Sequence, residues 1–213
     1  MMRELGLIPQ LINGRRVTDA ATLDIVTMFY AGKTNKQVVA ELQQLGINAL
    51  GLSGADGNVI QGVKRPVRDV DYGFVGDLTP ASINTNLVQQ LINAGLTPVL
   101  CPIIHDGRGQ LLNTNADTIA SAVAVALADK FAVTLHYCFE RNGVLLDVQN
   151  NESVIAKINT VEYAELKQQG IIADGMLPKL ENAFVALQQG VDKVIIGHAL
   201  NIRSDFHTVL CLN

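Results

Sequence analysis

The chain has 213 residues, of which 48% are hydrophobic and 17% are charged, and its formal net charge is −4. This composition excludes an intrinsically disordered protein, and the lack of a basic stripe argues against nucleic acid or an anionic membrane as a partner. The opening residues MMRELGLIPQ carry charges where a signal peptide needs an apolar stretch, and the three cysteines, an odd number, lie in apolar runs. We therefore expect a cytoplasmic protein with buried, reduced thiols.

Short apolar runs alternate with helical patterns along the chain. The runs are apolar on consecutive residues, which is typical of strands buried on both faces of a parallel sheet, and they cover residues 48–52, 97–104, 131–139 and 192–197. Helical periodicity covers residues 19–45, 82–94, 115–129, 160–168 and 177–189, with Gly46, Gly95 and Gly190 as end signals. The alternation predicts an α/β fold with a mainly parallel sheet sandwiched by helices.

Two segments depart from this alternation. Residues 58–76, NVIQGVKRPVRDVDYGFVG, are polar, alternating and punctuated by glycine, which predicts a β-hairpin flap at the end of the sheet. Residues 1–6 have the pattern of the last turn of a helix, and the usual first strand of an α/β domain is not visible before them. The sequence therefore predicts a fold that lacks N-terminal strands.

Residues 111–130 join the end of a strand to a helix. Asn115 suits the N-cap, and Asp117 suits the first turn, where the helix dipole favours a negative charge. Capping alone would explain both residues, but Asn113 is not needed for a cap. Two amides and a carboxylate at the carboxyl edge of a sheet could also bind a ligand, because open α/β folds bind their ligands there.

The segment DGMLPKLENAF, residues 174–184, places a lysine in the first turn of a predicted helix. Pro178 suits the first helical position, so Lys179 would lie at the positive end of the helix dipole, where a cation is mildly disfavoured. A carboxylate such as Asp117, or a phosphate, would compensate if it lay opposite. A solvated surface lysine is the alternative.

The segment NGRRVTDA precedes the long predicted helix, for which Thr18 is a plausible N-cap. Arg15 and Arg16 could bind a carboxylate bidentately from a tight loop, or they could be two solvated charges. AGKT at 31–34 lacks the glycine that a phosphate-binding loop needs at position 27, and the four histidines lack metal-ligand spacing. We expect neither a P-loop nor a metal site in the protein.

Taken together, these segments resemble the N-acetylglutamate kinases of the amino acid kinase family. Asn-x-Asn-Ala-Asp followed by Asp-Gly-Met-x-x-Lys is the most specific part of the match. The matching segments follow the family order over nearly the whole chain: NGRRVT (13–18), NALGLSGADGNVI (48–60), GFVGD (73–77), LNTNADTIA (112–120), GVLLD (143–147) and IADGMLPKLENAFVAL (172–187).

The resemblance implies ATP-dependent phosphorylation of the side-chain carboxylate of an N-acylglutamate, an early step of arginine biosynthesis. It implies that Arg16 holds the substrate α-carboxylate and that Asn113 and Asn115 contact the acylated amino acid. Asp117 would orient the catalytic lysines, and Lys179 would meet the nucleotide phosphates, which explains a lysine at a helix start.

The resemblance also implies how the chain is organised. Residues 1–213 would form one domain, with 1–110 mainly binding the acylglutamate and 111–213 mainly binding the nucleotide. Glu140 and Gly143 would lie at the nucleotide, Mg²⁺ would arrive with ATP, and the flap at 58–76 would cover the acyl group. Helix 19–45 would pair two subunits into a homodimer.

Some residues depart from the family pattern. The chain contains no Gly-Gly dipeptide, whereas the family carries a lysine-bearing first strand with a Gly-Gly turn and then a second glycine-rich loop. Phe139-Glu140-Arg141 replaces the usual Thr-Asp-Val of the nucleotide loop. We therefore expect impaired turnover by these 213 residues. The alternatives are a catalytically inactive binding or assembly module of the same fold, and another branch such as carbamate or aspartate kinases.

Overall fold

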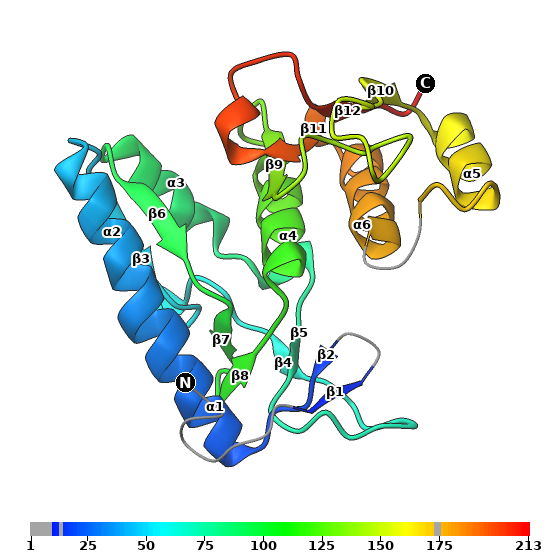
Figure 1. Ribbon diagram of the computed structural model, residues 1–213. Helices are drawn as coiled ribbons and strands as arrows, with labels where there is room; N and C mark the ends of the chain where they lie inside the picture. Colours follow the sequence, from blue (N-terminus) through cyan, green and yellow to red (C-terminus); the bar gives the residue numbers. More distant parts are fainter. Residues whose placement is uncertain (1–9, 13–14, 173–175) are drawn as a thin grey trace. The chain divides into compact units, whose positions relative to one another are not determined.

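The computed structural model describes residues 10–12, 15–172 and 176–213 (Figure 1). The chain forms two compact units, residues 1–119 and 120–213. The predicted α/β class is confirmed, because helices alternate with strands in both units and parallel pairs occur in both. Among the described residues, no helix is long and apolar enough to cross a membrane.

The first unit contains one long helix in three parts. They are α1 (Ala20–Thr27), a π-helical segment η2 (Met28–Thr34) and α2 (Asn35–Gln44), which follow one another as a continuous coil (Figure 1). Asp19 caps the start, because its side chain accepts a 2.7 Å hydrogen bond from the Thr22 N–H, and bonding to Thr22 holds the pKa of Asp19 below its ordinary value. The predicted cap at Thr18 was therefore wrong by one residue.

Short strands complete the first unit. β3 (Ala49–Leu52) pairs in parallel with β6 (Thr97–Leu100), and α3 (Thr85–Asn93) lies between them in sequence. Three antiparallel pairs join β1 (Leu11–Ile12) to β2 (Arg15–Arg16), β4 (Val63–Lys64) to β5 (Gly76–Asp77), and β7 (Ile103–His105) to β8 (Leu111–Asn113).

The predicted strand at 97–104 is two strands in different sheets. Pro102 lies between β6 and β7, and proline cannot donate a ladder hydrogen bond, so the run is divided there. The flap is confirmed as the antiparallel pair of β4 and β5. The apolar core of this unit includes Leu23, Val26, Cys101 and Ile103.

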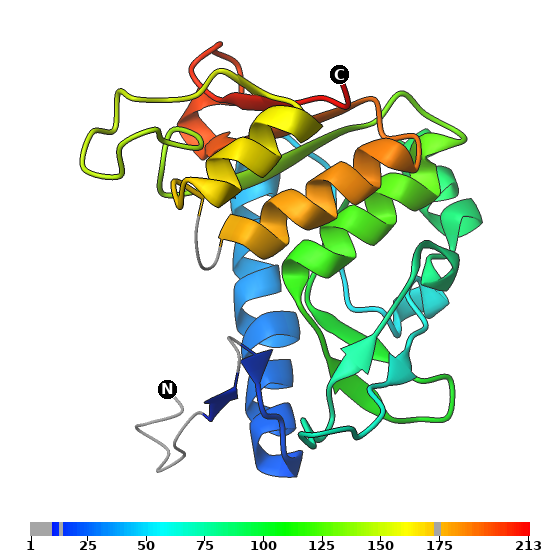
Figure 2. The same ribbon diagram turned by 90° about the vertical axis from the view of Figure 1, so that its right-hand side faces the viewer.

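The second unit is built on a four-stranded sheet in the order β10-β12-β11-β9. β9 (Thr134–Phe139) and β11 (Lys193–His198) pair in parallel, as do β10 (Lys157–Ile158) and β12 (Thr208–Leu210). The central pair, β11 with β12, is antiparallel. α5 (Thr160–Gln168) and α6 (Met176–Gln188) lie side by side against one face of this sheet (Figure 2).

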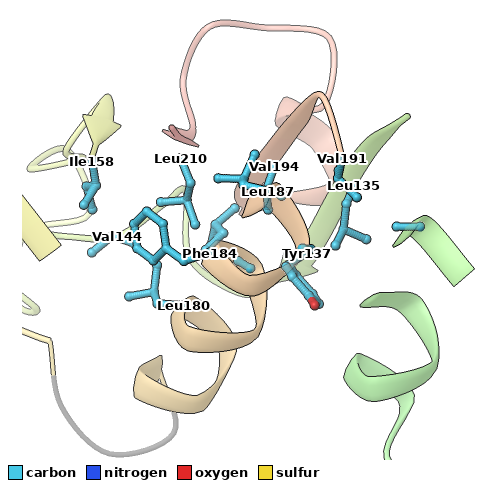
Figure 3. Packing of buried hydrophobic residues seen from close by; sticks show 14 of the residues in the cluster. Leu135, Tyr137, Val144, Ile158, Leu180, Phe184, Leu187, Val191, Val194 and Leu210 are labelled. Carbon is cyan, nitrogen blue, oxygen red and sulfur yellow. The ribbon is translucent and has the colours of Figure 1, made fainter. Parts of the chain in front are cut away.

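Helix α6 contributes more buried residues to the core of the second unit than any other single element. Leu180 and Ala183 are fully buried, and Phe184 and Leu187 are nearly so, at the helical spacing that the sequence predicts. Figure 3 shows Leu180, Phe184 and Leu187 of α6 packed among side chains of the strands, including Leu135, Tyr137, Val194 and Leu210. α6 begins at Met176, so Pro178 is its third residue and not its first.

Helix α4 (Ala116–Ala128) carries the boundary between the two units. Its C-terminal part belongs to the second unit, where Ala124 joins the buried cluster. The cysteines are free, as expected, but only Cys101 is buried; Cys138 is exposed because β9 alternates, with Leu135 and Tyr137 facing the core.

Candidate active site

A hydrogen-bonded junction in the first unit joins the segment of Arg16 to Asn113. Thr18 is completely buried, and its Oγ1 donates to the carbonyl oxygen of Arg16 at 3.2 Å. The same oxygen accepts a 3.1 Å hydrogen bond from Nδ2 of Asn113, which is 95 residues further along the chain and only 8% exposed. Two of the predicted substrate-binding segments therefore meet at Thr18, although the binding roles of their side chains stay predictions.

Residues 72–74, near the end of the flap, contact the backbone of Thr18 at this junction. The N–H of Thr18 donates a 2.9 Å hydrogen bond to the carbonyl of Tyr72. The N–H of Phe74 donates a 2.7 Å hydrogen bond to the carbonyl of Thr18. Between them, Gly73 has a φ of +71°, and a Cβ there would lie 2.2 Å from the Thr18 oxygen, so only glycine fits. The Asn113 N–H donates to the carbonyl of Phe74 at 2.9 Å. The flap is thus fixed to both candidate segments.

Asn115 and Asp117 lie where the sequence predicts them, at the start of α4. Asn115 Oδ1 accepts a 3.1 Å hydrogen bond from the Thr118 N–H, which confirms its capping role. Asp117 lies in the first turn of α4 and is partly exposed. Asp117 belongs to the first unit and Lys179 to the second, so the predicted approach of these two side chains stays a prediction.

The flap also contains a cavity of about 380 Å³ that sequence reasoning missed. Arg65 binds the Asp77 carboxylate through both Nε and Nη2, and its guanidinium lies 5.5 Å from the ring centre of Tyr72. The cavity is lined mainly by Arg65, Pro66, Arg68, Asp69, Tyr72 and Asp77. The alternation of basic and acidic residues in VKRPVRDVD was the available signal, but it does not indicate that the hairpin encloses space.

The second unit has a mainly apolar cavity of about 290 Å³ beside the predicted nucleotide loop. Gly143, one of the predicted nucleotide residues, lines it together with Phe139, Val144, Leu145, Ile172 and Met176. Arg141 lies at the same cavity and donates to Asn151 Oδ1 at 2.7 Å. Glu140 is exposed and is not part of the lining.

Lys179 lies near the start of α6, as its fourth residue. Its Nζ is 5.9 Å from the ring centre of Tyr137, a residue of β9. The negative face of an aromatic ring partly balances the charge of a lysine at this end of a helix. The side chain is only partly exposed, so its position is not that of a fully solvated lysine.

Three histidines that are distant in sequence lie at one small cleft of the second unit. His136, His198 and His207 line it with Cys138. Among the residues that the structure describes, buried Nδ1 of His136 has no hydrogen-bond partner. Burial, with His207 and Lys193 nearby, lowers the pKa of His136. Within the described part of the chain, no group of three His, Cys, Asp or Glu residues could hold a metal ion.

Comparison with known proteins shows which family the chain resembles. The model of the amino acid kinase family matches residues 1–198. An acetylglutamate kinase of Phocaeicola vulgatus is 53% identical over 207 residues, covering 97% of this chain and 80% of that protein. An acetylglutamate kinase of Methanopyrus kandleri is 40% identical over 201 residues, covering 92% of this chain and 79% of the relative.

A solved structure has a similar fold over the whole length. The structure of smu.665 from Streptococcus mutans UA159 has a TM-score of 0.82 and 30% identity, and the match covers 100% of this chain and 80% of that one. E. coli aspartokinase III, at 14% identity and a TM-score of 0.61 over 84% of this chain and 38% of that one, shares the fold alone. The chain therefore belongs to the amino acid kinase family.

Proposed function

We propose that the protein transfers the γ-phosphoryl group of ATP to the side-chain carboxylate of N-acetylglutamate or another N-acylglutamate, as a step of arginine biosynthesis in the cytoplasm. The observation that carries the proposal is the junction at Thr18, which joins the backbone of Arg16 to the side chain of Asn113. A cation and an amide on one rigid support match the α-carboxylate and the acylated amine of this substrate class. The high identity to acetylglutamate kinases supports the same assignment.

In the proposed complex, the first unit holds the acylglutamate. Arg16 binds the α-carboxylate, Asn113 and Asn115 contact the acylated amino acid, and the flap covers the acyl group. This assignment follows the predicted division at residue 110, although the compact units divide after Ile119. The rigid connection of the flap to Asn113 supports a covering role.

The second unit holds the nucleotide in this proposal. The apolar cavity at Gly143 and Met176 has walls suited to the flat face of a purine base. Lys179 meets the phosphates, Asp117 orients the catalytic lysines, and Glu140 lies at the outer edge of the nucleotide site. Mg²⁺ arrives bound to the ATP phosphates.

The chemistry brings a carboxylate and a triphosphate together, so the main barrier is repulsion between anions. One carboxylate oxygen forms a bond to phosphorus while the bond to the β-phosphate oxygen breaks, which yields an acyl phosphate and ADP. Positioning and positive charge supply most of the catalysis of phosphoryl transfer. Arg16, Lys179 and the helix N-termini are groups of this kind.

A second candidate is a catalytically inactive binding or assembly module of the same fold. It is favoured by a departure within the chain, because Phe139-Glu140-Arg141 replaces the Thr-Asp-Val of the family's nucleotide loop. Apolar residues exposed along the long helix, among them Met28 and Val38, also suit a homodimer interface there. Sedimentation measurements would give the oligomeric state.

Calorimetry tests the assignment. We expect binding of N-acetyl-L-glutamate and of ATP, and no comparable binding of aspartate or carbamate, which would indicate the other branches. Trapping of acyl phosphate by hydroxylamine, in the presence of both ligands, then separates enzyme from inactive module. Absence of acylglutamate binding at millimolar concentration would overturn the proposal.

A further inference from the structure

Thr18 has a role that neither its sequence context nor its position before α1 indicates. It follows a strand and precedes a helix, where threonine usually caps, but Asp19 takes that role. The Thr18 side chain is completely buried instead, and its backbone N–H and C=O are both bonded to the flap. Its hydroxyl therefore serves the two groups that it contacts, the Arg16 carbonyl and the Asn113 amide.

The hydroxyl of Thr18 determines which way the Asn113 amide points. A hydroxyl has one hydrogen, and the Arg16 carbonyl, which can only accept, takes it at 3.2 Å. Thr18 can then only accept from Asn113, so the amide must present its NH₂ group to Thr18. The opposite orientation would place two acceptors against each other. The 3.1 Å contact from Nδ2 is the arrangement that satisfies both bonds.

The side-chain oxygen of Asn113, Oδ1, is thereby available to accept a hydrogen bond from a ligand. Oδ1 makes no hydrogen bond with any residue that the structure describes, and it is not among the fully enclosed atoms that lack a partner. The Asn113 backbone is fixed by pairing with Ile103 and by its bond to Phe74. Asn113 thus offers a rigid acceptor at the end of β8.

We propose that Thr18 is a positioning residue that makes Asn113 Oδ1 the acceptor for the amide N–H of the substrate. This inference rests on the proposed function and adds a basis for specificity to it. The site would select a secondary amide, whose nitrogen carries a hydrogen, over an ester of the same shape. A site built to accept a substrate N–H rejects an analogue without it, because the acceptor is left unpaired.

The test compares two ligands that differ at one atom. N-acetyl-L-glutamate has the amide N–H, and 2-acetoxyglutarate has an ester oxygen in its place. We expect the wild-type protein to bind the amide about tenfold more tightly in calorimetry, as one buried hydrogen bond allows. A preference of less than twofold would overturn the proposal without any variant.

Two substitutions then assign the preference to Thr18. Thr18→Val keeps the shape but removes the hydroxyl, so the Asn113 amide is free to rotate and the amide-to-ester ratio should fall towards one. Thr18→Ser keeps the hydroxyl and should keep the ratio. A purely structural role would weaken both ligands equally, and an unchanged ratio in Thr18→Val would overturn the proposal.

Two further outcomes are separable. If Thr18→Val does not fold by circular dichroism, Thr18→Ala replaces it, with the same expected ratio and the same contradicting result. If the wild-type protein binds neither ligand, the proposed function itself is wrong, and the role of Thr18 is overturned with it. Binding of both ligands with equal affinity contradicts the Thr18 inference alone.

Discussion

Thr208 Oγ1 accepts a 2.8 Å hydrogen bond from the Val144 N–H, across 64 residues of the chain, and donates a 2.7 Å bond to the carbonyl of Ile155. Thr208 is completely buried, and Val144 lines the apolar cavity of the second unit. One hydroxyl therefore connects β12 to both sides of the loop that forms the cavity wall.

Replacing Thr208 should disturb this cavity. Thr208→Val removes the hydroxyl partner of the buried Val144 N–H and of the partly buried Ile155 carbonyl, so we expect the free energy of unfolding to fall by about 1–3 kcal/mol and ATP binding to weaken severalfold. Thr208→Ser is the matched control and should retain most of the affinity. Calorimetry with ATP and with N-acetylglutamate should show the loss for ATP alone; equal losses would indicate a general structural effect.

Lys179→Ala should weaken nucleotide binding more than acylglutamate binding. A charge-assisted bond to phosphate contributes about 1.5–3 kcal/mol, so the ATP dissociation constant should rise by about tenfold or more. Lys167→Ala is the control, because Lys167 of α5 forms an exposed salt bridge with Glu181 of α6 and has no assigned role in binding ATP. An unchanged ATP affinity in Lys179→Ala would contradict the assigned role.

His136 should make stability depend on pH. Its pKa is lower in the folded protein than the ordinary value of 6.5, so the unfolded chain binds a proton more readily as the pH falls. The stabilisation is complete above about pH 6.5 and is lost progressively below it. Urea unfolding between pH 5 and 8 should show that the free energy of unfolding of the wild-type protein rises with pH, with the slope of about one titrating group. The slope should be flatter in His136→Gln.

A substitution at Lys193 tests how much its charge contributes to the pH dependence of stability. Lys193 contributes to the lowered pKa of His136, after burial and His207, so Lys193→Met should reduce the pH dependence without removing it. If the free energy of unfolding depends on pH as steeply in His136→Gln as in the wild-type protein, a group other than His136 causes the dependence.

Leu180→Ala should be the most damaging single truncation of the core of the second unit. Leu180 is completely buried on α6, and removing its side chain leaves a cavity that costs about 2–5 kcal/mol. Leu146, which is 59% exposed, is the control, and Leu146→Ala should change the free energy of unfolding by less than about 0.5 kcal/mol. Chemical denaturation followed by circular dichroism measures both.

Local signals in the sequence located the helices well. The helix predicted at 160–168 has these bounds because Asn159 and Glu162 form a capping box, which is a local interaction. The helix ends at Gly46, Gly95 and Gly190 are confirmed, since each glycine has a positive φ. These features need only residues that are close in sequence.

Features that depend on distant contacts could not be predicted in the same way. Thr18 looked like a cap because the sequence cannot show that Asn113 lies against it. The cavity at Arg65 and Asp77 exists only once the hairpin has closed, and the cleft of three histidines needs the register of β9 with β11. The resemblance to a family indicated the candidate residues, but not the bonds between them.

The π-helical segment at Met28–Thr34 makes the two ends of the long helix differ in rotational phase. α1 contributes Leu23 and Val26 to an apolar cluster, whereas α2 faces β3 and β6 with Asn35, which donates to the Val99 carbonyl at 2.8 Å. A π-helical segment holds one more residue than the α-helical stretch that it replaces, so loss of one residue within Met28–Thr34 would let the coil close as α-helix and leave Asn35 close to that carbonyl. An in-frame deletion of one codon should therefore be tolerated inside this segment, whereas the same deletion within α1 or α2 would turn all residues after it by about 100°.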